Sequence, residues 1–207
     1  MVDARARFTV VSLGTVRLVL DWDGTCTVSD SLVDAIRAFG NAGVFRRGYG
    51  SYGESLAAEV GTIRATAEEV SSWAAAHVRV RPGLHGLAER YRPVIVSSGL
   101  PQLIAPVLAR EGLELEVRSN EADPLPGGWR LRFRDMGPCP VCGDMCKRRS
   151  LPAGRPLAYA GDGVSDRCAA RAADLVFARG WLADELEREG SPHRRFETLD
   201  DIAAALS

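Results

Sequence analysis

The chain has 207 residues, of which 46% are hydrophobic, and its formal net charge is -1. A chain of this size can bury one substantial core and carry a small insert, but it cannot form two full-sized domains. The near-neutral charge, with no dominant basic run, excludes the electrostatic pattern of a nucleic-acid or membrane-surface binder. We therefore expect chemistry on a small molecule.

The N-terminal residues 1–15 do not resemble a secretory signal, because charges at Asp3, Arg5 and Arg7 precede a short apolar run without a small-residue cleavage site. No 18 apolar residues occur in succession, so we expect no membrane span. Five cysteines, three of them within residues 139–146, do not form a framework of spaced disulfides. These features together predict a cytoplasmic protein with reduced thiols.

Strand and helix patterns alternate along most of the chain. Apolar, β-branched residues at 16–21 predict a buried strand that ends in a turn-rich segment, and helical periodicity follows at 32–39, 54–60 and 67–78. Further extended segments are predicted at 93–97, 114–118, 129–134, 157–160 and 174–178, and further helices at 101–110, 166–172, 181–189 and 199–206. This rhythm predicts an α/β fold with a doubly wound, Rossmann-like parallel sheet. The segments 114–118 and 129–134 are also compatible with a hairpin.

No strand is predicted between residues 31 and 80, so this helical block is interpreted as a small cap inserted after the first strand. The predicted division is a core domain of residues 1–29 and 81–207 and a helical cap domain of residues 30–80.

Reactive and phosphate-binding residue types gather in four regions that follow predicted strands. In an open parallel sheet, ligands bind beyond the carboxyl ends of the strands, so we expect these regions to meet in space. Their members are Asp21, Asp23, Gly24 and Thr25; Ser97, Ser98 and Gly99; Lys147; and Gly161, Asp162, Gly163, Ser165 and Asp166. Lys147 is the one lysine among 26 basic residues, which favours a site that needs a compact ammonium in place of the planar arginine fork.

Four segments of the chain resemble, in order, the four motifs of the haloacid dehalogenase superfamily. They are Asp21-Trp22-Asp23-Gly24-Thr25, Ser97-Ser98-Gly99, Lys147 and the segment from Gly161 to Asp166. The resemblance spans nearly the whole chain and implies a magnesium-dependent phosphatase that acts through an aspartyl-phosphate. The implied Mg²⁺ ligands are the Asp21 carboxylate, the Asp23 backbone carbonyl and Asp162, with Asp166 beside or directly behind them.

The chemistry of phosphoryl transfer accounts for each of these residue types. Asp21 is the expected nucleophile, and Asp23, two residues further on, is the expected general acid and base. A divalent cation with hard oxygen ligands is needed where carboxylates and phosphate crowd together, which favours Mg²⁺. Lys147 is expected to balance the negative charge, while phosphate oxygens are expected to contact the hydroxyl or backbone N–H groups of Thr25, Ser97, Ser98 and Gly99.

Finer matches favour one branch of the superfamily. The helical insert resembles the cap of the phosphoserine phosphatase-like members, where Asp30 matches an acidic substrate-contacting residue, although Asp30 equally suits a helix cap. The stretch Cys142-Gly143-x-x-Cys146-Lys147 and the tail segments 176–179 and 195–198 resemble the methionine-salvage phosphatases that act on 2-hydroxy-3-keto-5-methylthiopentenyl-1-phosphate. The order of cysteine followed by lysine also resembles the phosphoethanolamine and phosphocholine phosphatases. The cysteine spacing is wider than the CGxCK usual in the methionine-salvage enzymes. Phosphoethanolamine, phosphocholine and phosphoserine therefore remain alternative substrates.

Cys139, Cys142 and Cys146 are close enough in sequence to share a metal, but a structural zinc site needs four ligands and no histidine has a diagnostic spacing. Packing of the loop around Lys147 is the favoured interpretation, with zinc binding or a disulfide as alternatives. A competing hypothesis of another class is a non-catalytic, zinc-stabilised binding module. The expected partner is a small phosphorylated metabolite, with neither nucleic acid nor membrane, and the expected assembly is a monomer or homodimer.

Overall fold

The computed structural model describes residues 16–135 and 137–207, so the prediction on residues 1–15 lies outside the described residues. Within the described ranges, six parallel strands form one sheet in the order β3-β2-β1-β6-β7-β8. These strands are β1 (Arg17–Leu20), β2 (Val94–Val96), β3 (Val117–Arg118), β6 (Leu157–Gly161), β7 (Leu175–Ala178) and β8 (Arg194–Arg195). The predicted α/β fold with a Rossmann-like parallel sheet is confirmed.

The strand order reverses at β1. Leu20 pairs with Ile95 of β2 on one side and with Ala160 of β6 on the other, and all of these pairings are parallel. The chain fills the sheet outward from β1 first toward β3 and later toward β8. Such a reversal leaves a crevice beyond the carboxyl ends of the central strands, which is where doubly wound sheets bind ligands.

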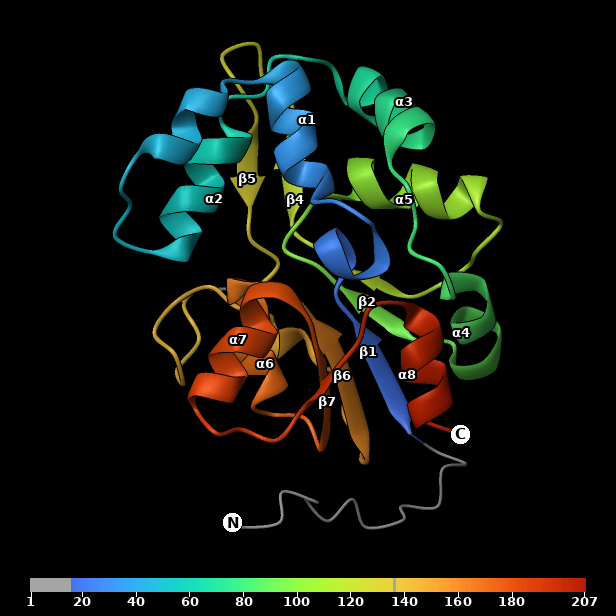
Figure 1. Ribbon diagram of the computed structural model, residues 1–207. Coiled ribbons are helices and arrows are strands. Elements are labelled where there is room, and N and C mark those ends of the chain that lie inside the picture. The colour runs from blue at the N-terminus through green and yellow to red at the C-terminus, as the bar shows by residue number, and fades with distance from the viewer. Residues whose placement is uncertain (1–15, 136) are drawn as a thin grey trace.

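Helices cover both faces of the sheet because side chains of a strand point alternately to its two sides. Leu18 and Leu20 pack into one apolar cluster with α4 (Leu84–Tyr91), α5 (Pro101–Arg110) and α8 (Leu199–Ala205). Val19 points the other way, into a second cluster with α6 (Arg167–Ala170) and α7 (Gly180–Arg188). Figure 1 shows α4 and α8 on one side of the strands and α6 and α7 on the other. No helix of the described chain is long and apolar enough to cross a lipid bilayer.

The insert between β1 and β2 is helical, as the sequence predicts, and lies over the carboxyl end of the sheet (Figure 1). It contains α1 (Ser31–Phe39), η3 (Ala42–Arg46), α2 (Tyr52–Val60) and α3 (Ala67–His77). The segments that enter and leave it lie side by side, because Thr27 and Val80 form an antiparallel bridge. Side chains of Asp30, Ser51 and Thr66 cap the three α-helices. The division into a core and a cap at residues 30 and 80 stays a prediction.

A two-stranded antiparallel hairpin, β4 (Glu121–Asp123) with β5 (Arg130–Arg132), lies beside the insert. The alternative pairing of 114–118 with 129–134 is wrong, because β3 instead adds to β2 in the main sheet. The extended pattern at 114–118 identifies a strand but not its partner, which depends on contacts distant in sequence. Helix α4 and the short, exposed strand β8 were not among the predicted elements.

Candidate active site

Asp21 follows β1 directly and is buried, with 2% of its surface exposed. Its backbone N–H continues the sheet by donating to Ala160 O at 2.9 Å. One carboxylate oxygen, Oδ1, accepts from Lys147 Nζ, whereas Oδ2 is buried without a hydrogen-bond partner. Burial raises the pKa of Asp21 well above its usual value, Lys147 opposes this shift, and the neighbouring carboxylates add to it. Further positive charge near Asp21 would favour the ionised form of this carboxylate.

The segment 22–26 turns sharply at Gly24, whose backbone lies in the left-handed region with φ +75°. A Cβ atom there would lie 2.2 Å from Asp162 Oδ2, so glycine is required both for the turn and for the close approach of Asp162. Thr25 is buried next to it, and its hydroxyl donates to Asp162 Oδ1 at 3.4 Å. The turn thus brings the end of β1 against the loop that follows β6.

Two arginines donate hydrogen bonds to the backbone carbonyls of this turn. The buried guanidinium of Arg81 donates from Nε to Thr25 O at 2.9 Å and from Nη2 to Gly24 O at 2.8 Å and Thr27 O at 3.0 Å. Arg179 Nη1 donates to the same Gly24 carbonyl at 2.8 Å. Arg81 was not predicted as a site residue, since one arginine among 25 carries no sequence signal of its own.

Asp23 lies at the boundary between the sheet and the insert. Its Oδ1 accepts from the Ser31 backbone N–H at 2.8 Å and from the Ser31 hydroxyl. Burial raises the pKa of Asp23 to about 7, the charge of Asp30 adds to the rise, and the hydrogen bonds from Ser31 oppose it. A carboxyl group with a pKa near neutrality can both give and take a proton, as general acid–base catalysis requires.

Lys147 begins the short helix η4 (Lys147–Ser150) and is 5% exposed. Its ammonium donates to Asp21 and, at 2.7 Å, to Asp166 Oδ1. Burial lowers the pKa of Lys147, but the two carboxylates raise it by more, so the ammonium stays protonated. Tyr159 on β6 donates its hydroxyl to the same Asp166 oxygen at 2.5 Å.

Carboxylate oxygens of Asp21, Asp162 and Asp166 all lie within 4.8 Å of one another. Asp162 follows β6, and burial raises its pKa to about 6, with a contribution from the charge of Asp166 and opposition from Lys147. Asp166 is already saturated, because Oδ1 accepts from Lys147 and Tyr159 and Oδ2 accepts from the backbone N–H groups of Asp162 and Gly163 at 3.0 and 2.9 Å. These contacts hold Lys147 and the Asp162 loop in place, and a part for Asp166 in metal binding stays a prediction.

Mg²⁺ fits this donor set. The ion prefers oxygen ligands, and the unpartnered Oδ2 of Asp21 lies beside the Asp162 carboxylate. The carboxylates of the buried Asp21 and Asp166 and of the half-buried Asp162 lie close together with one ammonium beside them, so a divalent cation would also stabilise this group of charges. The side chains that would hold the ion are those of Asp21 and Asp162, and the backbone carbonyl of Asp23 stays a predicted third ligand.

The predicted phosphate-binding loop follows β2. The hydroxyl of Ser97 accepts from the Gly99 N–H at 2.8 Å, whereas Ser98 and Gly99 themselves line the cavity that contains Asp21. Asn120 donates to the Ser98 carbonyl at 2.8 Å and so holds this loop from the neighbouring strand end. Tyr52 of the insert interacts with the side chains of Ser98 and Ser165, and burial raises its pKa to about 12.

One cavity of about 280 Å³ connects the sheet edge with the insert. On the sheet side it is lined by Asp21, Asp23, Gly99, Lys147, Asp162 and Asp166, so most predicted site residues come together there. The insert contributes a mixed wall of Asp30, Leu32, Val33, Phe45, Tyr52, Leu56 and Glu59. Asp30 is thus both the cap of α1, accepting from Val33 N at 2.8 Å, and part of the cavity wall.

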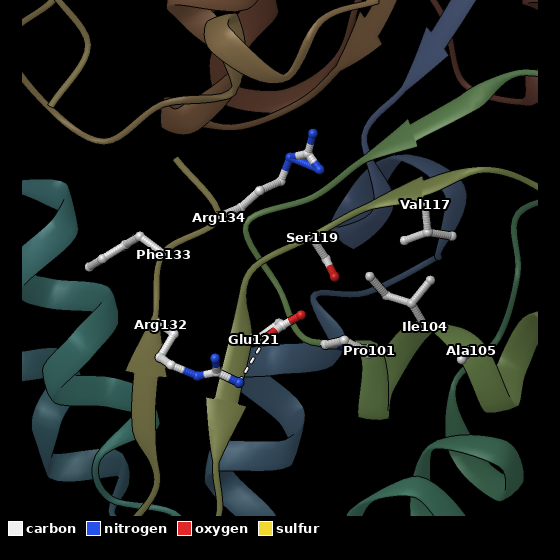
Figure 2. Close-up of a pocket in the computed structure, with 9 residues that line it drawn as sticks. All are labelled: Pro101, Ile104, Ala105, Val117, Ser119, Glu121, Arg132, Phe133 and Arg134. Atoms are coloured by element: carbon white, nitrogen blue, oxygen red, sulfur yellow. Dashed lines mark ion pairs between the residues drawn. The ribbon is translucent and has the colours of Figure 1, made fainter. Parts of the chain in front are cut away.

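A larger cavity of about 430 Å³ lies elsewhere, between α5, β3 and the β4–β5 hairpin (Figure 2). Arg132 and Glu121 form an ion pair of 2.7 Å across its hairpin side, and the Arg134 side chain points away from that pair. None of the carboxylates that surround Lys147 lines it. Its size therefore does not make it the catalytic cavity.

Sequence comparison relates the chain to phosphatases, although no family model matches it. It is 26% identical, over 91% of its length and 94% of the relative's, to a 2-hydroxy-3-keto-5-methylthiopentenyl-1-phosphate phosphatase of Brevibacillus brevis. It is 31% identical to the polyol phosphate phosphatase PYP1 of Saccharomyces cerevisiae, over 55% of this chain and 54% of that protein.

Structural comparison gives the same fold. A phospho-aspartyl intermediate analogue of phosphoserine phosphatase aligns with a TM-score of 0.65 at 16% identity, covering 93% of this chain and 98% of that one. A substrate-bound phosphoserine phosphatase aligns with a TM-score of 0.65 at 13% identity, covering 93% and 99%. The sheet and its helices therefore have the architecture of these phosphatases.

Proposed function

We propose that this chain is a phosphatase of the haloacid dehalogenase superfamily and that it hydrolyses a small phosphomonoester with Mg²⁺ as cofactor and Asp21 as nucleophile; its similarity to phosphatases in sequence and fold supports this. The observation that carries the proposal is the convergence of Asp21, Asp162 and Lys147 from three separate segments on one cavity. A cytoplasmic location and a monomeric or homodimeric state stay predictions from the sequence.

The proposed reaction has two steps. An Asp21 oxygen attacks the phosphorus atom and the bond to the substrate oxygen breaks, while Asp23 gives its proton to that leaving oxygen. Asp23 then takes a proton from water as the water attacks phosphorus, and the bond to Asp21 breaks to release phosphate. When bound, Mg²⁺ would supply positive charge against the phosphate oxygens, and Lys147 adds an ammonium held beside Asp21.

The substrate proposed first is 2-hydroxy-3-keto-5-methylthiopentenyl-1-phosphate, the substrate named for the Brevibacillus relative. The side chains of Leu32, Val33, Phe45 and Leu56 supply apolar surface on the insert side of the cavity, which suits a methylthio group. Among the described residues that line the cavity, Lys147 is the one cation, and it is engaged by Asp21 and Asp166. A substrate with its own carboxylate, such as phosphoserine, therefore has no free counter-ion there.

Phosphoethanolamine or phosphocholine is the second candidate. Asp30 and Glu59 lie on the insert side of the cavity, where their charge would favour an ammonium group on the substrate. Burial raises the pKa of both carboxyls, and an ammonium group bound beside them would favour their ionised forms.

The test is phosphate release from a panel that contains the methylthio compound, phosphoethanolamine, phosphocholine and phosphoserine, with Mg²⁺ present. We expect turnover of the first compound, loss of turnover with EDTA, and recovery on addition of Mg²⁺. Asp21→Asn keeps the side-chain shape but removes the nucleophilic carboxylate, so it should abolish turnover. Full activity of Asp21→Asn would refute the mechanism, whereas preference for an amine would redirect only the substrate.

A further inference from the structure

Four cysteine sulfurs lie together, and one of them belongs to Cys146, which directly precedes Lys147. Those of Cys139, Cys142, Cys146 and Cys168 are all within 4.8 Å of one another. The first three come from the loop that precedes η4, and the fourth comes from α6. Sequence reasoning lacked a fourth ligand because Cys168 is distant along the chain, and the fold supplies it.

The sulfur spacing suits a shared metal ion better than a disulfide. Zinc–sulfur bonds of about 2.3 Å in a tetrahedron give sulfur–sulfur edges of about 3.8 Å, whereas a disulfide brings its sulfurs to about 2.05 Å. Cys139 Sγ and Cys168 Sγ are 4.0 Å apart. Packing alone does not account for the cluster either, because Cys142 is exposed and Cys146 only half-buried.

The local backbone also presents sulfur in the way a metal site requires. In the turn Cys139-Pro140-Val141-Cys142-Gly143, the Val141 N–H donates to Cys139 Sγ at 3.4 Å and stabilises negative charge on that sulfur. The Gly143 N–H donates to Cys139 O at 2.8 Å, and Gly143 has φ +75°, which closes the turn. Cys142 is thereby brought onto the same side as Cys139, with the two-residue spacing typical of zinc ligands.

We propose that Cys139, Cys142, Cys146 and Cys168 together bind one structural zinc ion. Four thiolates in a tetrahedron select zinc among abundant divalent ions, and they leave no open position for catalysis. The oxygen donors of Asp21 and Asp162 form a separate and harder site. The zinc site goes beyond the proposed phosphatase activity and stands or fails independently of it.

The zinc ion would hold together the two segments that carry Lys147 and Asp166. Cys146 immediately precedes Lys147, and Cys168 follows Asp166 by two residues, so one ion would join the segments whose side chains meet at 2.7 Å. Asp144, within the same loop, accepts from the Tyr52 and Gly53 N–H groups at the start of α2, at 2.6 and 3.2 Å. The loop thus connects the metal cluster with both Lys147 and the insert.

The test measures metal content directly, on the full chain expressed in zinc-supplemented medium and purified without chelator. We expect about one zinc per chain in the wild type. The control variant is Cys26→Ser, which replaces the fifth cysteine, outside the cluster, and it should contain the same amount of zinc. Cys168→Ser and Cys142→Ser should lose zinc. Cys142 is exposed, so its variant separates loss of the metal from failure to fold.

A second variant separates the two metal sites. Asp162→Asn should impair Mg²⁺-dependent turnover but retain zinc, so the failure of either proposal is visible without the other. Cobalt in place of zinc should give the intense visible bands of a tetrahedral thiolate site in the wild type but not in Cys142→Ser. Iron in place of zinc, fewer than about 0.1 zinc per wild-type chain, or unchanged zinc in both cysteine variants would overturn the proposal.

Discussion

Lys147 donates to Asp166 at 2.7 Å, and the same carboxylate also accepts from the Tyr159 hydroxyl and two backbone N–H groups. All of these hydrogen bonds come from the loop after β6 or from β6 itself, apart from the one from Lys147. Asp166 therefore holds the ammonium in a fixed direction toward Asp21, at the position where negative charge is expected to gather during phosphoryl transfer.

Replacing Lys147 by methionine should lower kcat by about 10²–10³-fold, because a preorganised charge is removed from the transition state. Steady-state kinetics on the best substrate from the panel measures this loss. Arg37→Met is the matched control, since it removes a cation of which 62% is exposed on α1, and it should change kcat by less than about twofold. Wild-type kcat in Lys147→Met would exclude the ammonium from catalysis.

Replacing Asp30 by asparagine should move the basic limb of the kcat profile to lower pH. Burial first, and then the charge of Asp30, raise the pKa of Asp23 to about 7. Loss of the Asp30 charge lowers the pKa of Asp23, so the protonated form that serves as general acid disappears at a lower pH. Asparagine still accepts from Val33 N and keeps the helix cap.

The control for this pH experiment is Asp34→Asn, which makes the same change of charge on the same helix. The main causes of the Asp23 pKa shift include Asp30 but not Asp34, so the profile of Asp34→Asn should lie much closer to that of the wild type. Coincident profiles for Asp30→Asn and the wild type would contradict the assignment of Asp23 as the acid.

Replacing Gly24 by alanine should weaken Mg²⁺ binding and lower the free energy of unfolding by about 1–3 kcal/mol. The added Cβ would lie 2.2 Å from Asp162 Oδ2, and alanine is strained at φ +75°. Titration of activity with Mg²⁺, together with urea unfolding, measures both effects. In Gly86→Ala on α4 the Cβ meets open space, so that variant should gain about 0.5–1 kcal/mol. Equal Mg²⁺ requirement in Gly24→Ala and the wild type would argue against a metal at Asp162.

Replacing Asp144 by alanine should cost about 0.5–2 kcal/mol of stability, since two N–H groups at the start of α2 lose their acceptor. Tyr52 lies in that first turn and lines the cavity, so KM should rise as well. Ser51→Ala removes the local cap of the same helix but keeps its connection to the loop, and we expect a comparable loss of stability with a smaller change in KM. If Asp144→Ala had the Tm and KM of the wild type, the contact between Asp144 and α2 would contribute neither to stability nor to substrate binding.

Local patterns in the sequence were enough to predict the fold class and to choose the candidate reactive residues. Alternation of apolar strands with helical segments predicted the parallel sheet, because burial on both faces leaves a continuous apolar run in each central strand. The rule that ligands bind beyond the carboxyl ends of such strands then singled out Asp21 and Asp162. The lone lysine drew attention to Lys147 through composition alone.

Contacts between segments that are distant along the chain became visible only in the folded molecule. Strand β3 pairs with β2, and Arg81 donates to the carbonyls of Gly24 and Thr25. Cys168 lies beside three cysteines of another loop. Local periodicity carries no information on such contacts, because hydrogen bonds and metal ligands are specified by distances in space. Spacing along the chain specifies them only within a single turn, as it does for Cys139 and Cys142.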